Sequence, residues 1–384
     1  MRTNTSTSIT AIDSAAWDAL NAGGSPFLRH AFLATLESAG CVGSGTGWHP
    51  APITLYDDRG LAAAAPAYVK WHSFGEFVFD QHWAQAYAQH GLEYYPKLTV
   101  GVPFTPATGP RLLVRPDLDA HAMRVKLIAA IRDHAEAHRF SSIHALFVDE
   151  ADRAALADSG WLTRHDVQFH WHNRQYRDFD HYLEGFTAEK RKKVKRERRR
   201  VAEDGITFDT LLGSALDRAA IDEIYALHRD TFLQHGNEPY LSPAFFRAMP
   251  LALGDSFMVK RARCRGETVA AAVFFWSADA LYGRYWGAVE QHHSLHFETC
   301  YHQGVDFCIE RGISRFEPGT QGLHKVSRGF VPAQTSSMHW IVDSRFREAI
   351  GDYLRREGPA VEEYAREIAE HVPYRDARRE ARSK

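Results

Sequence analysis

The stretch FEPGTQGLHKVSRGF, residues 316–330, brings together side chains that can move protons, bind anions and approach a ligand closely. It holds a carboxylate, an amide, a histidine and two cations among glycines: Glu317, Gly319, Gln321, Gly322, His324, Lys325 and Arg328. Glycine lets a backbone come close to a bound molecule, and polar residues that follow a strand are typical of ligand loops. The pattern therefore predicts a binding loop with acid–base chemistry.

The residue types of this loop suit transfer to an amine. Glu317 is a candidate catalytic base, which accepts the proton of an attacking ammonium directly or through water. Lys325 and Arg328 are candidates to neutralise a phosphate or a developing oxyanion. The expected substrate-binding set also contains Gly319, Gln321 and His324. A structural alternative stays open, in which Glu317 and Arg328 pair with each other and order the loop.

Two aromatic residues in the stretch YGRYWGA join the candidates. Tyr285 is a candidate catalytic acid toward a leaving group, and Trp286 is a candidate substrate-binding residue. The stretch is typical of a strand, so simple alternation places Arg284 on the face opposite Tyr285. The competing interpretation is that these aromatic side chains fill a core.

The run EQHHSLHFETCYHQ, residues 290–303, contains four histidines, two acids and a cysteine. It has no HExxH motif, and the adjacent His292 and His293 cannot share one helix face, so we predict no metal site. Glu298 and His302 are four residues apart and are expected to pair on one face of a helix. Glu298 is a candidate catalytic residue if this helix lines the site, and ordinary helical structure is the alternative.

A dense basic run, KRKKVKRERRR at residues 190–200, stands in a chain whose formal net charge is −2. Thr187 is a suitable helix cap and Gly205 a suitable stop, which predicts a helix over residues 188–204. Val194 and Val201 form only a thin apolar stripe on this helix.

Like charges four residues apart on the basic helix repel each other, and an anionic ligand would offset that cost. The candidate residues for binding an anion or tRNA are Lys192, Lys195, Arg196 and Arg199. The alternative is that the run is a solvated helix face.

The composition limits the class of protein. A chain of 384 residues with 45% hydrophobic side chains is long enough for two globular domains. No run approaches the roughly 20 apolar residues that span a bilayer, and the amino terminus lacks the apolar core of a secretory signal. We expect a cytoplasmic protein, with peripheral contact at the inner membrane face left open. Four scattered cysteines are expected to be reduced and structural: Cys41, Cys264, Cys300 and Cys308.

Both halves of the chain show the same order of predicted elements. The first half has a hairpin that turns at Asp57–Gly60, then a strand at 97–104, a helix at 120–139, a strand at 141–148, a helix at 150–160 and a closing strand pair within 161–173. The second half has a hairpin that turns at Arg265–Gly266, then a strand at 280–288, a helix at 294–311 ended by Gly312, and strands within 313–319 and 334–343. The expected domains are residues 1–175 and 176–384.

This duplicated plan resembles two tandem GNAT (N-acetyltransferase-type) folds, and several stretches are similar to the FemAB-like family of peptidoglycan biosynthesis or recognition proteins. They include SPFLRHAFLATLE, VPFTPATGPRLL, the basic run, YGRYWGA and FEPGTQGLHKVSRGFVPAQTSSMHW. The resemblance implies an α+β fold, with two GNAT-like domains that each have a mixed, mostly antiparallel sheet flanked by helices. It implies transfer of an aminoacyl or acyl group to a primary amine, and no bound cofactor.

The resemblance implies either aminoacyl-tRNA or acyl-CoA as co-substrate, and tRNA or a lipid-linked peptidoglycan precursor as partner. CoA-dependent relatives hold the pyrophosphate on a glycine-rich turn at a helix amino terminus. The stretch GAVEQHHSLHFETC lacks such glycines after Gly287, and TPATGPRLL offers only Gly109 and Arg111, with Pro110 removing an amide donor. This favours a tRNA-borne donor. The alternatives are an acyl-CoA-dependent N-acyltransferase of a small metabolite and a non-catalytic module that binds peptidoglycan precursors or RNA.

Overall fold

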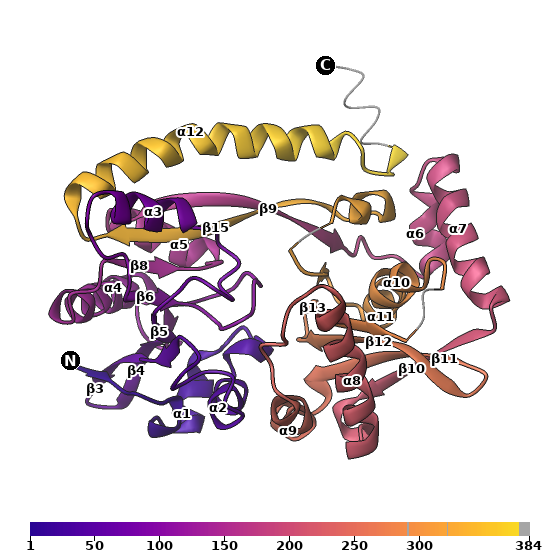
Figure 1. The fold of residues 1–384 in the computed structure, drawn as a ribbon, viewed down its shortest axis with the longest axis horizontal. Helices are drawn as coiled ribbons and strands as arrows, with labels where there is room; N and C mark the ends of the chain where they lie inside the picture. Colours follow the sequence, from indigo (N-terminus) through magenta and orange to yellow (C-terminus); the bar gives the residue numbers. More distant parts are fainter. Residues whose placement is uncertain (290–291, 321, 376–384) are drawn as a thin grey trace. The chain divides into compact units, whose positions relative to one another are not determined.

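The computed structural model describes residues 1–289, 292–320 and 322–375, and the chain forms two compact units (Figure 1). Unit 1 consists of Met1–Asp166 and Gln334–Glu362, and unit 2 consists of Val167–Ala333 and the residues from Glu363 onward. The predicted α+β class is confirmed, since each unit has a sheet flanked by helices. A single division at residue 175 does not reproduce these units, because residues 334–362 return to unit 1.

Unit 1 contains most of the amino-terminal elements. They are β1 (Arg2–Thr5), α1 (Ser14–Leu20), α2 (His30–Ser38), β2 (Trp48–Pro50), β3 (Ile53–Asp57), β4 (Gly60–Ala65), β5 (Ala67–Lys70), α3 (Gln81–Gln89), β6 (Lys97–Val100), β7 (Leu113–Val114), α4 (Ala120–Ala137), β8 (Ser142–Ala145) and α5 (Glu150–Asp158). Three further elements contain residues of both units: β9 (Leu162–His172), β15 (Val331–Ile341) and α12 (Ser344–Ala369).

The strands of unit 1 form two sheets. One has the order β1-β3-β4-β7, and the predicted hairpin at Asp57–Gly60 is its β3–β4 turn. In the other, β15, β8, β6, β5 and β2 are neighbours in this order, with β6 and β8 parallel. Helix α4 begins after Asp119, whose carboxylate caps Ala122 N–H, and its predicted apolar face is confirmed because Met123, Leu127 and Ile131 are buried.

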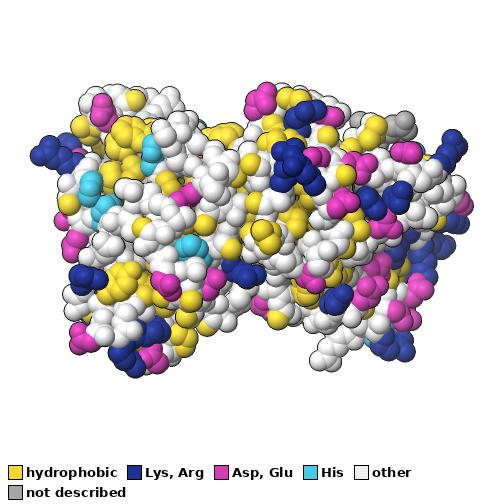
Figure 2. All heavy atoms as spheres, turned by 90° about the horizontal axis from the view of Figure 1, so that it is seen from below, with side chains coloured by type: hydrophobic (Ala, Val, Ile, Leu, Met, Phe, Trp, Pro, Cys, Tyr) yellow, Lys and Arg dark blue, Asp and Glu magenta, His cyan; other side chains and the backbone are white. Residues whose placement is uncertain are grey.

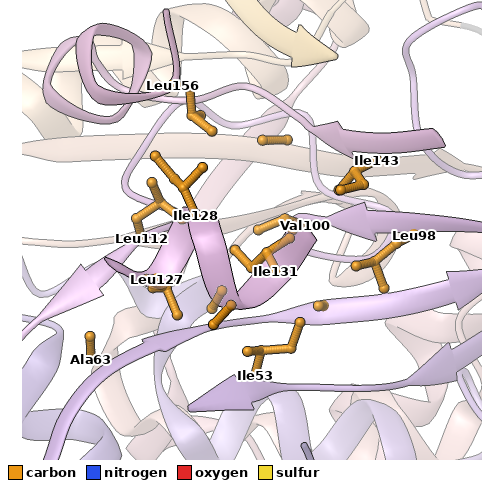
Figure 3. Close-up of a cluster of buried hydrophobic side chains, with 14 of the residues drawn as sticks. Ile53, Ala63, Leu98, Val100, Leu112, Leu127, Ile128, Ile131, Ile143 and Leu156 are labelled. Atoms are coloured by element: carbon orange, nitrogen blue, oxygen red, sulfur yellow. The ribbon is translucent and has the colours of Figure 1, made fainter. Parts of the chain in front are cut away.

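The two faces of the β15-β8-β6-β5 strands differ in chemistry. One face packs apolar side chains such as Leu98, Val100 and Ile143 against α4 (Figure 3). The side chains between them are polar and are 5% exposed or less: Lys70, Lys97, Thr99, Ser142, His144, Ser337 and His339. Strand alternation thus separates an apolar core from a buried polar layer.

Unit 2 holds the remaining elements. They are α6 (Phe179–Glu184), α7 (Ala188–Glu203), β10 (Ile206–Leu212), α8 (Arg218–Gln234), α9 (Pro243–Leu253), β11 (Phe257–Cys264), β12 (Glu267–Trp276), β13 (Ala280–Ala288), α10 (Leu295–Phe297), the π-helical turn η5 (Glu298–His302), α11 (Gln303–Arg311), β14 (Arg315–Glu317) and the 3₁₀ turn η6 (Leu323–Arg328). Its strands have the order β10-β11-β12-β13-β14-β9, with only β13 and β14 parallel.

The sequence predictions for unit 2 are largely confirmed. The hairpin turns at Arg265–Gly266, and Gly312 ends α11 in the left-handed region at φ 68°. The closing strand pair predicted within residues 161–173 is wrong, because β9 runs through this range as one strand. Residues 162–172 contain no glycine, proline or asparagine, and Asp166 is the one turn-favouring residue among them.

The predicted basic helix is confirmed as α7, and Gly205 follows it at φ 73°. Thr187 occupies the cap position, but its side chain makes no capping hydrogen bond. Val194 and Val201 are buried as expected, and so is Glu197, the single acid of the run. The buried stripe of α7 is therefore mixed rather than purely apolar.

Candidate functional site

A β-bulge between β12 and β13 shapes the centre of the candidate site. Val273 pairs with Tyr285 and Phe274 with Gly283, so Arg284 is an extra residue on β13. Arg284 and Tyr285 both line a cavity of about 170 Å³, and the Arg284 guanidinium lies 5.6 Å from the Tyr285 ring centroid. The expected placement of Arg284 on the face opposite Tyr285 is therefore wrong, because the bulge breaks the strand alternation.

Helical residues complete this cavity, which we call the bulge cavity. Trp286, His296, Cys300 and Tyr301 line it together with the bulge residues, and the ring centroids of Trp286 and His296 are 5.2 Å apart. Burial lowers the pKa of His296 to about 4, with the nearby His324 as a smaller cause. His296 is therefore a neutral imidazole near pH 7. The sequence signal for it was only the histidine run, which did not single it out.

A second cavity, of about 570 Å³, shares Trp286 and His296 with the bulge cavity. Its other lining residues come from the end of α8, the end of β13 and the segment that leads into α10: Thr231, Gln234, His235, Ala288, Val289, His292 and Leu295. Trp286 and His296 therefore lie between the two cavities.

The predicted ligand loop contributes His324 and Lys325 to this neighbourhood. His324 Nε2 lies 2.8 Å from the Tyr301 hydroxyl, and its ring centroid is 5.9 Å from that of His296. Lys325 is 2% exposed and its ammonium donates to the Gly319 carbonyl at 2.7 Å. Burial lowers the pKa of Lys325 from 10.5 to about 7, so it changes charge near neutral pH. Gly319 has φ 92°, and Gln321 lies outside the described residues.

The expected alternative pair of Glu317 with Arg328 is wrong. Arg328 is 3% exposed and holds Glu197 of α7 with two hydrogen bonds, of 2.7 and 3.1 Å. Glu317 instead lies 2.8 Å from Arg315, which is two residues earlier on the same face of β14, and 3.9 Å from His170. The next residue, Pro318, is the one that lines the bulge cavity.

The expected pair of Glu298 with His302 is also wrong. Glu298 accepts a hydrogen bond of 2.8 Å from Gln303 and lies 3.2 Å from Arg198, while His302 lies 3.4 Å from Glu197. The reason is the π-helical turn that contains both residues, which brings positions five apart, rather than four apart, onto one face. Two consecutive α7 residues thus fasten this helix to η5.

Helix α7 presents cations on two sides. A groove of about 700 Å³ is lined by Glu189 and six cations, including all four predicted anion-binding residues: Arg191, Lys192, Lys193, Lys195, Arg196 and Arg199. A smaller cavity of about 370 Å³ is lined by Lys193, Arg196 and Arg200 of α7 and by residues near the ligand loop, among them His324 and Arg328. Figure 2 shows Lys and Arg gathered at the side of unit 2 where α7 lies in Figure 1, with acids among them.

The fragment TPATGPRLL in unit 1 is closed to a phosphate. The Arg111 guanidinium donates to the carbonyls of Ala107 and Leu146, at 2.6 and 2.9 Å. The backbone N–H groups of Arg111 and Leu112 donate to the Asp152 carboxylate, at 2.5 and 2.8 Å. An internal anion thus uses the amides that a pyrophosphate would need.

The histidines, cysteines and acids do not form a metal centre in the part of the chain that the structure describes. Within it, no group of three or more such residues is arranged to hold a metal ion. None of the described helices is long and apolar enough to cross a bilayer. All four cysteines are free thiols.

Comparison with known proteins identifies the family. The FemAB-like family model, described as peptidoglycan biosynthesis/recognition, matches residues 8–376. The chain belongs to the FemAB-like family. No individually curated protein matches this chain.

Solved structures share the fold of this FemAB-like protein. FemX has a TM-score of 0.55 at 11% identity, with 91% of this chain and 100% of FemX covered. The C-terminal domain of a putative lysylphosphatidylglycerol synthetase from Agrobacterium fabrum has a TM-score of 0.53 at 12% identity, with 92% and 98% covered. A tandem GNAT protein from the clavulanic acid biosynthesis pathway has a TM-score of 0.45 at 11% identity, with 89% and 99% covered. The predicted fold is confirmed by its likeness to FemX along nearly the whole chain.

The predicted site residues of this FemAB-like protein fall into three places. Tyr285 and Trp286 line the bulge cavity, and His324 and Lys325 lie beside it. Arg328 and Glu298 contact α7. Glu317 is held by Arg315. The residues that line the bulge cavity without having been predicted are Arg284, His296, Cys300 and Tyr301.

Proposed function

We propose that this FemAB-like protein is an N-acyltransferase that moves an aminoacyl or acyl group from a tRNA-borne donor to a primary amine in cell-wall peptide metabolism. The observation that carries the proposal is that a cationic cavity and the bulge cavity are neighbours within unit 2. His324 lines the cationic cavity beside α7. Its ring also contacts the ring of His296, which lines the bulge cavity. Phosphates and a reactive carbonyl thus have neighbouring sites of suitable character.

In the proposed reaction the amine nitrogen attacks the ester carbonyl, the new C–N bond forms and the C–O bond to the donor breaks. We place His296 as the acceptor of the proton that the amine loses, because its imidazole lines the cavity. We assign this role to His296 rather than Glu317, whose carboxylate is engaged by Arg315. Tyr285 gives a proton to the leaving hydroxyl, and the Lys325 ammonium stabilises the oxyanion.

The outer cations of α7 suit a long polyanion. Lys192, Arg196 and Arg199 line one groove, and no ion pair among the described residues ties them to a buried acid. A tRNA acceptor stem offers a row of phosphates that such a groove neutralises. Because tRNA is a cytoplasmic donor, we place the reaction in the cytoplasm, with a lipid-linked peptidoglycan precursor as acceptor.

Acyl-CoA-dependent transfer to a small metabolite is the second candidate function. The cationic cavity lined by Lys193, Arg196 and Arg200 favours it, because its size suits one or two phosphate groups. In a non-catalytic recognition module, by contrast, substitution of His296 or Tyr285 would change only the binding of the precursor. Transfer assays with each donor separate these candidates.

Reversal of three α7 cations should reduce the salt dependence of tRNA binding. We expect aminoacyl-tRNA to bind with a log–log salt slope that falls by close to 3 in Lys192→Glu/Arg196→Glu/Arg199→Glu, since each phosphate contact contributes close to one unit. Filter binding across a salt series measures this slope. The matched control is Arg345→Glu/Arg355→Glu/Arg366→Glu, which makes the same charge change on exposed positions of α12 and should keep the slope. An equal fall of the slope in both variants, or a flat slope in the wild type, would exclude α7 as a tRNA-binding surface.

Lys325 should give the stability of the protein a measurable pH dependence. Its pKa is about 7 in the folded chain and 10.5 when the side chain is fully solvated, as in an unfolded chain, so the unfolded state binds more protons between these values. Its contribution is therefore full above pH 10.5 and is lost as the pH falls toward 7, by up to about 1.4 kcal/mol per pH unit. Between pH 7 and about pH 9 the free energy of unfolding should rise by about 2 kcal/mol more in wild type than in Lys325→Met.

Urea unfolding at the two pH values measures this difference. Lys192→Met is the matched control, because that lysine is exposed on α7, and it should follow the wild type. Parallel pH dependence in wild type and Lys325→Met would show that Lys325 keeps an ordinary pKa.

A further inference from the structure

We propose that the loop between β5 and α3 of unit 1, residues 71–80, is a contact site for the interface of a lipid bilayer. The loop WHSFGEFVFD contains only two acids, Glu76 and Asp80, and both are buried, at 3% and 2% exposure. Its large apolar side chains face outward instead, with Trp71, Phe74 and Phe79 exposed at 56%, 57% and 61%. Surface loops usually show the reverse distribution.

A single buried ammonium closes the loop. Lys97 is fully buried, and its Nζ donates to Ser73 Oγ at 2.7 Å and to Asp80 Oδ2 at 2.5 Å. Ser73 and Asp80, near the two ends of the loop, both bind Lys97 Nζ. The exposed Phe74 and Phe79 are their direct neighbours in the chain, so their backbone positions are held close to the same ammonium. The outward aromatic side chains therefore project from one closed loop rather than from scattered positions.

A second set of contacts fixes the backbone of the loop on its inner side. The Phe74 carbonyl accepts hydrogen bonds from Lys70 Nζ at 3.2 Å and from Trp48 Nε1 at 3.0 Å. His72 Nε2 lies 3.2 Å from the Thr46 carbonyl, and burial, followed by the charge of Lys70, lowers the pKa of His72. The loop is thus held in this inverted arrangement by polar contacts on its inner side.

A bilayer interface fits this loop better than a protein partner does. Trp is enriched at membrane interfaces, and Trp and Phe anchor peripheral proteins there. Insertion would bury no unpaired charge, because Glu76 and Asp80 already bind Lys97. Three side chains on one loop are too few for a stable protein interface, which buries roughly 1,200–2,000 Å². Shallow insertion needs no such area. This site is independent of the transfer chemistry proposed for unit 2.

Co-sedimentation with vesicles tests the proposal on the full chain. We expect wild type to bind vesicles of phosphatidylcholine, and Trp71→Ser/Phe74→Ser/Phe79→Ser to reduce the bound fraction at least tenfold. The matched control Val125→Ser/Leu233→Ser/Leu251→Ser removes other exposed apolar side chains and should stay within twofold of wild type. Thermal unfolding of all three proteins should be unchanged, which shows that the loop variant folds.

Four results would overturn the proposal. Wild type does not bind the vesicles, or both variants lose binding equally. Binding occurs only on vesicles that contain phosphatidylglycerol and disappears on reversal of Lys192, Arg196 and Arg199 while the loop variant still binds, which makes α7 the contact. Wild type self-associates and the loop variant is a monomer, which makes a second copy of the chain the occupant. Each of these results leaves the proposed transfer activity standing.

Discussion

Replacement of Lys97 by Met should destabilise the protein by about 3–5 kcal/mol, because it removes the one cation shared by two buried acids. Lys97 Nζ lies 2.8 Å from Glu76 and 2.5 Å from Asp80, and none of the three side chains is more than 2% exposed. Methionine fills a similar volume but leaves two carboxylates buried without their cation. Because an uncompensated buried charge costs far more than an exposed one, unit 1 should unfold at much lower urea concentration.

Two further variants make the Lys97 result specific. Lys260→Met removes another buried lysine, whose ammonium donates to the Thr210 hydroxyl at 2.7 Å, and should cost less because no carboxylate is left unpaired. The triple variant Lys97→Met/Glu76→Gln/Asp80→Asn should recover part of the loss, since neutral amides replace the charges. Equal losses for Lys97→Met and Lys260→Met in urea unfolding would show that the ion triad does not decide the stability of this layer.

Replacement of Arg328 by Met should destabilise unit 2 by about 3 kcal/mol and weaken tRNA binding. Arg328 supplies two hydrogen bonds to the buried Glu197, and its guanidinium lies 3.4 Å from the Phe297 ring centroid. Without it, α7 loses its tie to the ligand loop, so the cations that face His324 lose their fixed positions. Arg328→Lys should be intermediate, because a lysine cannot make the two-pronged contact.

Denaturant unfolding and tRNA filter binding measure the two effects of Arg328→Met. The double variant Glu197→Leu/Arg328→Met should be more stable than the single variant, because no buried charge remains. Arg199→Met is the matched control for stability only, since this exposed arginine lies 3.4 Å from Glu203 and should change stability by less than about 0.5 kcal/mol. If Arg328→Met is as stable as Arg199→Met, the ion pair does not hold α7.

The positions of most elements were predictable from local patterns. Apolar spacing in 120–139, glycines at 205, 266 and 312, and alternating residues in 255–277 act over a few residues, and tertiary contacts did not override them. The prediction of a strand pair within 161–173 was wrong, because two short strands and one long strand show the same alternation of side chains along the sequence. Return of β15 to unit 1 also has no local signal, since strand pairing joins residues far apart in the chain.

The sequence by itself determined most of the secondary structure and which short stretches carry reactive groups, because those depend on residue type and near neighbours. Only the tertiary structure decided how the groups are paired. Arg328 binds Glu197, which is 131 residues away in the chain, and does not bind the nearby Glu317. The β-bulge places Arg284 in the lining of the same cavity as Tyr285. A π-helical turn likewise separated Glu298 from His302. Buried charges must find partners wherever packing brings an opposite charge within reach, and that choice is made by the whole fold rather than by spacing along the chain.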